Sequence, residues 1–531
     1  YVRKIDNIYN DEFSDEVNEE LTRVPLEVKE SDLVNRLDLR NEFIVTIDGE
    51  DAKDLDDAVS ASKEDYGYLV GVHIDDAISL RRLKNGNYYL EVHIADVSYY
   101  VEEGSELDKE ALNRGTSIYV ADRVVPMLPF MLSNGICSLN PHVDRLTISC
   151  LIKLDKNGNV LSSEIKPSVI KSSERLTYTY VNEVIDKGLS STKLEKQIQL
   201  LNEIALLLRK IKVERGELDL AIPELKVIVN KDGEAIDLTK KVQKAGEKLI
   251  EDFMILANEQ VAETIFRMNL PFIYRIHENP PAKRMDTLIA FASRLGFKPH
   301  FDAVSVKPKD MQRLLDDAKY SDKYTILGQV LLRSLAKARY ATNNKGHFGL
   351  ASKCYTHFTS PIRRYPDLIV HRYLHKYLFE GNIQNAYEKM EELNYIAENT
   401  SMKERRAIAV ERESTDMKCA EYMRQFIGVD FKGYITGMNN SGLFVELDNG
   451  VSGKVAFETM NDYYFVDDNC FNAAGRRKGK RYSLGDTVEV TVIDTNKDAG
   501  EISLEIKSEK RFVGRYARRK IENKKNKRRR K

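Results

Sequence analysis

The spacing of apolar residues changes twice along this chain of 531 residues. After about residue 40, short alternating runs predict strands, among them 43–47 and 88–97. From about residue 190 to residue 425, apolar residues recur at i, i+3 and i+4. This spacing predicts helices over 194–213, 247–267 and 329–339, and one or two long helices between 385 and 426.

From about residue 427 the spacing returns to two, which predicts a small barrel. Five short strands in about 80 residues, separated by Gly and Asn turns, are typical of a closed barrel of the OB type. Aromatic residues fall among these strands, and rings such as Phe431 and Tyr434 can stack on nucleic-acid bases. Core packing is the alternative for several of the rings, and we expect Phe444 to lie in the core.

These patterns predict a multidomain α+β protein. We expect a lead-in over 1–40, a mixed domain of sheet and surrounding helices over 41–426, the barrel over 427–508 and a basic tail over 509–531. The formal net charge is only −1, but residues 515–531 contain eleven Lys or Arg and one Glu. We expect the tail to be disordered and to attract nucleic acid. A solubility or targeting extension is the alternative.

Cysteine usage and hydropathy indicate the compartment. The five cysteines are scattered and form no CxxC pair, which argues against a disulfide framework or a cysteine zinc site and fits a reducing cytosol. No apolar run is long enough to cross a bilayer. We therefore expect a cytoplasmic protein.

The candidate chemistry begins in residues 46–60, TIDGEDAKDLDDAVS. Asp48, Asp54, Asp56 and Asp57 fall within ten positions, directly after the strand predicted over 43–47. Carboxylates packed this closely repel one another unless a cation joins them. Oxygen ligands without sulfur select hard ions such as Mg²⁺. The stretch therefore predicts a Mg²⁺ site for phosphoryl chemistry.

The acidic stretch has two other interpretations. An acidic loop that caps a helix is an open alternative, because acids favour turns and helix N-termini. A calcium-binding EF-hand does not fit, because Lys53 stands where its loop needs Gly and Val59 where it needs Glu. The unit DDAVS at 56–60 is echoed by DDAIS at 75–79. We assign the site to the first copy, because the second has no upstream partner equivalent to Asp48 or Asp54.

A second informative stretch is HFTSPIRRYPDLIVHR, residues 357–372. Pro361 suits the first position of a helix, which would place Arg363 and Arg364 in its first turn. Cations are unfavourable there, so the two arginines suggest a nearby anion such as a phosphate. A structural salt bridge to acids is the alternative.

These two stretches resemble signature segments of the ribonuclease II/R (RNB) superfamily. HIADVSYYV at 93–101 and GICSLNPHVDRLT at 135–147 resemble further segments, and the barrel resembles the S-one type of RNA-binding domain. The resemblance covers about residues 35–508, and the basic tail is more like the bacterial ribonuclease R branch. The cold-shock-type domains that usually precede the catalytic domain are absent, and the chain begins with Tyr1, so we expect a fragment.

The resemblance implies a processive, hydrolytic 3′→5′ exoribonuclease that releases nucleoside 5′-monophosphates with two Mg²⁺ ions. It implies that Asp48, Asp54 and Asp57 bind metal, and that Asp56 also binds metal and is indispensable for turnover. It further implies that Arg363 holds the scissile phosphate.

The resemblance also implies contacts with a single-stranded 3′ end of RNA. The residues that it implies are Tyr119, which would clamp the terminal base, Glu251 and Glu411. From the residue patterns above we also expect Arg364, and Phe431 and Tyr434 on the barrel, to bind RNA. Leu220 stands where the family often carries Phe, which weakens a two-sided aromatic clamp. We expect a monomer, and structured RNA with a 3′ overhang as a further substrate. The competing hypothesis is a catalytically silent RNA-binding or ribosome-associated factor.

Overall fold

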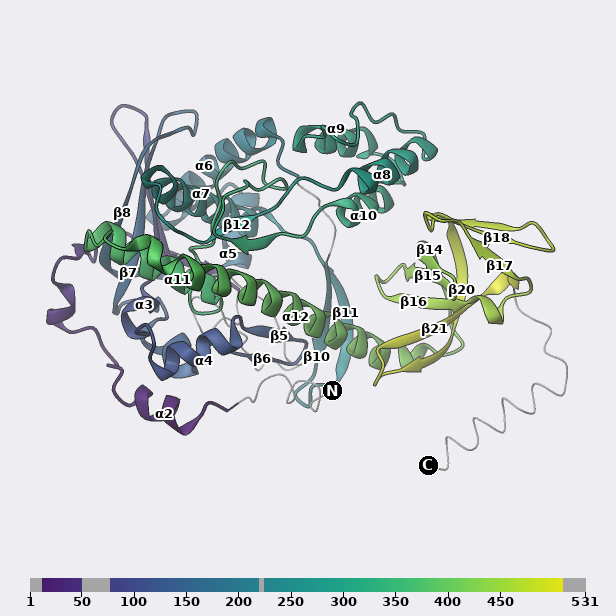
Figure 1. The fold of residues 1–531 in the computed structure, drawn as a ribbon, viewed down its shortest axis with the longest axis horizontal. Coiled ribbons are helices and arrows are strands. Elements are labelled where there is room, and N and C mark those ends of the chain that lie inside the picture. The colour runs from purple at the N-terminus through teal and green to yellow at the C-terminus, as the bar shows by residue number, and fades with distance from the viewer. Residues whose placement is uncertain (1–11, 50–76, 219–223, 510–531) are drawn as a thin grey trace. The chain divides into compact units, whose positions relative to one another are not determined.

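A computed structural model describes residues 12–49, 77–218 and 224–509 of the chain (Figure 1). The chain divides into two units, each described here by itself. The first comprises residues 1–236 and 241–415, and the second residues 237–240 and 416–531. Helices and a large sheet in the first unit and a barrel in the second confirm the predicted α+β organisation.

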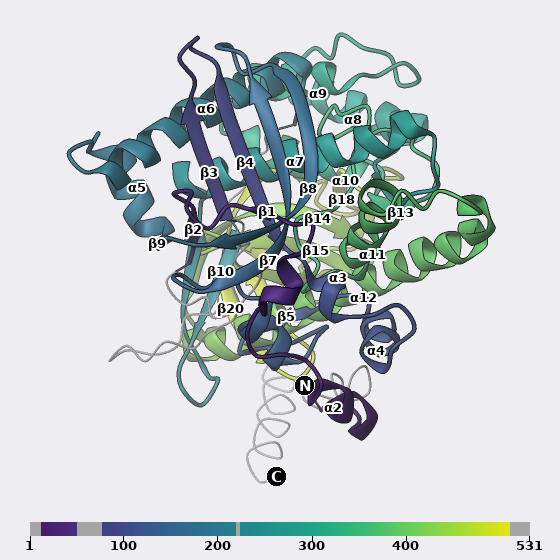
Figure 2. The same cartoon turned by 90° about the vertical axis from the view of Figure 1, so that its left-hand side faces the viewer.

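A seven-stranded sheet forms the centre of the first unit (Figure 2). Its strands are, in spatial order, β1 (Leu37–Asp38), β8 (Val160–Lys171), β7 (Asp144–Leu154), β4 (Tyr88–Ala95), β3 (Ala77–Arg82), β2 (Val45–Asp48) and β9 (Glu174–Thr177). The pairs β1–β8 and β2–β9 are parallel, and the others are antiparallel. The turn between β3 and β4 contains Asn85 and Gly86, whose φ of 83° favours glycine.

Helices α6 and α7 pack against the sheet, where α6 contacts β3 and α7 contacts β4 and β7 (Figure 2). The helices of this unit are α2 (Asp15–Leu21), α3 (Val97–Tyr100), α4 (Glu106–Arg114), α5 (Tyr178–Asp186), α6 (Lys193–Arg215), α7 (Ala245–Met268), α8 (Ala282–Arg294), α9 (Pro308–Ala318), α10 (Tyr324–Ser334), α11 (Tyr365–Leu374) and the first part of α12 (Met390–Met423). Among the described helices, none combines the length and apolar character needed to cross a membrane.

The predicted helices form, but one is displaced, because α10 covers Tyr324–Ser334 instead of 329–339. Helix α10 ends at Ser334 rather than near residue 339, because the backbone of Leu335 is extended and Arg339–Ala341 forms β13. Strand β13 pairs with β12 (Tyr274–Ile276). Two further hairpins are β5 (Ile118–Val120) with β6 (Arg123–Val125), and β10 (Glu224–Val229) with β11 (Ala235–Lys241). One core extends from the sheet to α5, α6, α7 and α11.

The second unit contains the predicted closed barrel of five strands. Its strands are β14 (Asp430–Asn439), β15 (Gly442–Leu447), β16 (Ser452–Ala456), β21 (Glu501–Ile506) and β20 (Thr487–Asn496), in that order around the barrel. Between β16 and β20 the chain forms a separate sheet, which the sequence pattern did not predict. Its strands are β17 (Tyr464–Val466), β18 (Asn472–Gly475) and β19 (Arg481–Ser483).

The prediction that Phe444 lies in the barrel core is wrong. Successive residues of a strand point to opposite faces, and Leu443, Val445 and Leu447 of β15 are fully buried. Phe444 therefore points outward and is 37% exposed. Its cross-strand neighbour is the exposed Lys454 of β16.

Candidate active site

Asp48 is the last residue of β2 and is fully buried. The strand is held on both sides, because Asp48 pairs with Thr177 of β9, and Thr46 pairs with Ala77 of β3. The backbone N–H of Gly49 donates a hydrogen bond of 2.5 Å to Asp48 Oδ1. A carboxylate at the end of a strand fixed between two neighbours is a rigid oxygen donor, which suits a hard cation.

Asp54, Asp56 and Asp57 lie outside the described residues. Within residues 12–49, 77–218 and 224–509, no three His, Cys, Asp or Glu side chains form a group that could hold a metal ion. Of the two strands that pair with β2, the antiparallel one is β3, which begins at Ala77. On this side, the residues that pair with the strand of Asp48 are Ala77 and Ile78, which belong to the second copy of the echoed unit at 75–79.

The segment that carries Arg363 and Arg364 is a turn, and the predicted helix start is wrong. Helix α11 begins at Tyr365, with Pro366 in its first turn, rather than at Pro361. Arg364 is extended, with φ −132° and ψ 119°, because it forms a bridge to Thr116. The backbone of Arg363 contacts the same segment, because its carbonyl oxygen accepts hydrogen bonds from the Ser117 N–H at 2.9 Å and the Thr116 hydroxyl at 3.1 Å.

The two arginine side chains have different partners. Arg364 Nη2 lies 2.7 Å from Asp367 Oδ1, and Asp367 is fully buried. The same oxygen accepts the Ser360 N–H at 2.8 Å. Burial opposes the charge of Arg364, but Asp367 raises the pKa of the guanidinium above its ordinary value. Arg363 Nη2 instead donates to the Ser360 hydroxyl at 3.2 Å. Arg364 thus has the structural salt bridge that we considered as the alternative.

Tyr119, Glu411 and Arg363 come together although they are far apart in sequence. The Tyr119 N–H of β5 donates to Glu411 Oε1 of α12 at 2.9 Å. Burial raises the pKa of Glu411, whereas the Tyr119 N–H and the charge of Arg363 lower it. The neighbouring residues Ile118 and Val120 are buried with α12. Residues 116–120, which end in β5, therefore contact both the Glu411 carboxylate and the backbone of Arg363.

The remaining predicted residues lie elsewhere. Glu251 is exposed on α7, and Leu220 lies outside the described residues. Phe431 and Tyr434 are both half-buried on β14, and their odd spacing directs them to opposite faces of the strand. Phe431 contacts Phe426 edge to face, with ring centroids 5.8 Å apart.

The residues that position this site were not predicted from the sequence. Asp367 and Ser360 hold the two arginines, and Thr116 and Ser117 hold the backbone of Arg363. One signal was available, because Asp367 follows Arg364 by three positions, the spacing of an ion pair across a helical turn. The bridge to Thr116 joins residues 248 positions apart and has no local signal.

The fold and these segments define an RNB-family protein, and the chain belongs to that family. The RNB domain matches residues 36–76 and 74–380, and the S1 RNA binding domain matches residues 424–507. The predicted family and the predicted order of catalytic-type domain and barrel are confirmed. The two RNB matches overlap at residues 74–76, which is where the second copy of the echoed unit begins.

The chain is similar to proteins named Ribonuclease R. Ribonuclease R 1 of Lactococcus lactis is 43% identical over 501 residues, which are 93% of this chain and 59% of the relative. Ribonuclease R of Thermotoga maritima is 43% identical over 500 residues, 92% of this chain and 68% of the relative. The structure of Mycoplasma genitalium RNase R in complex with ribose methylated single-stranded RNA has a TM-score of 0.87 at 30% identity. The alignment covers 94% of this chain and 76% of that one.

Proposed function

We propose that the protein is a processive 3′→5′ exoribonuclease that hydrolyses RNA to nucleoside 5′-monophosphates. The observation that carries this proposal is the junction of Tyr119, Glu411 and Arg363 in an RNB-family chain. In this proposal the ring of Tyr119 would receive the terminal base and the guanidinium of Arg363 would bind a phosphate. The relatives named Ribonuclease R support the same activity.

The proposed metal is Mg²⁺, bound as two ions by Asp48, Asp54, Asp56 and Asp57. The one described member of this set fits, because Asp48 is a fully buried carboxylate on a fixed strand. Oxygen ligands of this kind suit a hard divalent ion. When bound, the two ions would supply a water that is nucleophilic at neutral pH and would stabilise the leaving oxygen.

The residues of the chain would orient the RNA for this hydrolysis. Arg363, whose backbone is held by Thr116 and Ser117, would bind the non-bridging oxygens of the scissile phosphate. Charge on those oxygens grows in the transition state, so a preorganised guanidinium lowers the barrier. Glu411 would act by holding the backbone of Tyr119, so that the ring meets the terminal base.

The second copy of the acidic pair is the alternative source of two metal ligands. Strand β3 follows directly after Asp75 and Asp76 and pairs with the strand of Asp48. The second RNB match also begins at residue 74. These two observations favour the second copy. The first copy, Asp56 and Asp57, is favoured because Asp48 and Asp54 lie shortly before it in the sequence, and the second copy has no equivalent upstream acids. Asp→Asn variants of each pair, Asp56 with Asp57 and Asp75 with Asp76, distinguish the two assignments.

RNA is the proposed partner, with its single-stranded 3′ end in the first unit and the S1 barrel as a further contact. Structured RNA with a 3′ overhang is a proposed substrate. We also propose a monomer in the cytoplasm. The five cysteines are all free, which suits a reducing compartment.

The test uses a 5′-labelled RNA with a 3′ overhang, incubated with and without EDTA and separated on a sizing gel. The proposal predicts shortening from the 3′ end in Mg²⁺ and none in EDTA. The alternative, a catalytically silent RNA-binding factor, predicts that the RNA stays intact in both while it is still bound. Internal fragments would instead indicate an endonuclease.

A further inference from the structure

The sheet β17–β18–β19 has one face buried and one face open. On the buried face, Tyr464 stacks on Phe457, with centroids 5.4 Å apart and planes at 21°. The ring of Tyr482 lies 5.6 Å from Tyr464 on the same side. These contacts fix the sheet to the second unit and leave its other face to solvent.

The open face carries two exposed aromatic rings. Tyr463 is 65% exposed and Phe465 is 54% exposed, and their rings meet edge to face at 4.9 Å. Phe465 pairs with Ala474 of β18, and Ala474 pairs with Arg481 of β19, so the three share one face. Since neighbouring strands lie about 4.8 Å apart, Phe465 and Arg481 stand about 10 Å apart across the small Ala474.

The turn between β18 and β19 is strongly basic. The sequence from Gly475 to Tyr482 is GRRKGKRY, which holds five cations in eight residues. The turn has a fixed shape, because the buried carboxylate of Asp462 accepts backbone N–H groups of Arg477 and Lys478 at 2.7–3.0 Å. These hydrogen bonds use no cationic side chain, and Arg476, Arg477 and Lys478 are exposed.

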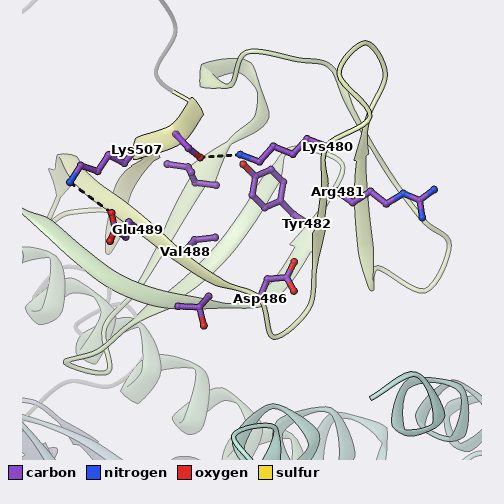
Figure 3. Close-up of a pocket in the computed structure, with 10 residues that line it drawn as sticks. Lys480, Arg481, Tyr482, Asp486, Val488, Glu489 and Lys507 are labelled. Carbon is purple, nitrogen blue, oxygen red and sulfur yellow. Dashed lines mark hydrogen bonds and ion pairs between the residues drawn. The ribbon is translucent and has the colours of Figure 1, made fainter. Parts of the chain in front are cut away.

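Not every cation belongs to the open face. Lys480, Arg481 and Tyr482 are among the residues that line a pocket of about 660 Å³, where Lys480 Nζ donates to the Ser508 hydroxyl at 3.0 Å (Figure 3). The Arg481 side chain points away from Lys480 and Tyr482 (Figure 3). Four cations therefore remain for the open face and its edge: Arg476, Arg477, Lys478 and Arg481.

We propose that this open face, Tyr463, Phe465 and the four cations, binds single-stranded RNA by base stacking and phosphate contacts. Exposed rings stack on unpaired bases, and a guanidinium can cover the other side of a base. The cations match the charge of the phosphate backbone. A duplex offers phosphates but no free base faces, and an acidic protein surface would not need both rings. The surface is separate from the barrel strands β14 and β15 that carry Tyr434 and Phe444.

The first test measures affinity of the full chain for a fluorescent oligouridylate in EDTA. A length of about 20 nucleotides exceeds the roughly 4–16 that one OB fold covers. We expect Tyr463→Ala with Phe465→Ala to weaken binding about tenfold or more, because each stacked base contributes strongly. The matched control is Tyr320→Ala, which removes a ring that is 96% exposed in the first unit and should change nothing.

The second test concerns charge. Replacing Arg476, Arg477 and Lys478 with Gln should lower the slope of log Kd against log salt by about 2, at about 0.7 per phosphate contact. The control replaces three exposed lysines of the first unit, Lys283, Lys298 and Lys319, with Gln and should leave the slope unchanged. Unchanged affinity in the aromatic variant would overturn the proposal. An effect of the charge variant alone would also overturn it, in favour of a general polyanion site.

The inference extends the proposed function but can fail separately from it. Binding is measured in EDTA, whereas hydrolysis of a tetranucleotide is measured in Mg²⁺. We expect the surface variants to hydrolyse the tetranucleotide at the wild-type rate. A third readout is cross-linking of 4-thiouridine RNA, which should label the peptide that contains Tyr463 and Phe465. Labelling confined to other peptides would contradict the assignment.

Discussion

Arg364 and Arg363 are adjacent in sequence, but the structure predicts opposite consequences when each is replaced with Gln. Arg364→Gln leaves the fully buried Asp367 without its cation. Removing one partner of a buried ion pair costs about 3–5 kcal/mol of unfolding free energy. The Arg364 side chain is 18% exposed, so we expect the lower end of that range, about 3 kcal/mol. Arg363→Gln loses a contact with the neutral Ser360 hydroxyl and should cost about 1–2 kcal/mol.

Activity should show the reverse order. Arg363→Gln should lower kcat on single-stranded RNA about 10²-fold or more, because it removes charge stabilisation in the transition state. Arg364→Gln should keep most of its activity at temperatures where it remains folded. The assays are urea unfolding and single-turnover hydrolysis. A double variant with Asp367→Asn should recover part of the lost stability, since it removes the stranded charge.

Two outcomes would refute this division of roles. If Arg364→Gln were as stable as wild type but inactive, Arg364 would act on RNA rather than on Asp367. If Arg363→Gln lost stability but not turnover, the guanidinium of Arg363 would be structural.

Two further predictions concern the acids. If the first copy of the echoed unit binds metal, the double variant Asp56→Asn with Asp57→Asn releases no mononucleotides. The double variant Asp75→Asn with Asp76→Asn then still releases them. The reverse result would assign metal binding to the second copy. Burial raises the pKa of Glu411 in the folded state above its unfolded value of about 4.5. The protonated side chain therefore contributes stability below pH 4.5, and this contribution is lost as the pH rises through the folded pKa. Glu411→Gln should therefore gain stability relative to wild type as pH rises from about 4.5 to 7 in urea titrations, and parallel curves would contradict this.

The sequence predicted most elements because their patterns are local. Apolar spacing indicated α6, α7 and α12, and alternation indicated β4 and the barrel strands. It misplaced Phe444, because an aromatic residue in a strand was assigned to the core without following alternation through Leu443 and Val445. The sheet β17–β19 was missed because its strands have only three or four residues each.

The candidate site was predictable in its residues but not in its connections. The acidic stretch and the two arginines stand out by charge alone. By contrast, the bonds from Thr116 and Ser117 to Arg363, and from Tyr119 to Glu411, join distant segments. Only the folded chain shows that Arg364 forms an ion pair with Asp367. Arg363 instead donates a hydrogen bond to Ser360, and its charge lowers the pKa of Glu411.

The most direct measurement follows an RNA labelled at its 3′-terminal nucleotide and identifies the first labelled product by chromatography. If the protein is a 3′→5′ exoribonuclease, the wild-type chain in Mg²⁺ releases the label as a nucleoside 5′-monophosphate. Asp48→Asn, which replaces a buried carboxylate with an amide of the same shape, should bind the RNA but release none. Release by Asp48→Asn at the wild-type rate, or a longer labelled fragment as the first wild-type product, would contradict the proposed function.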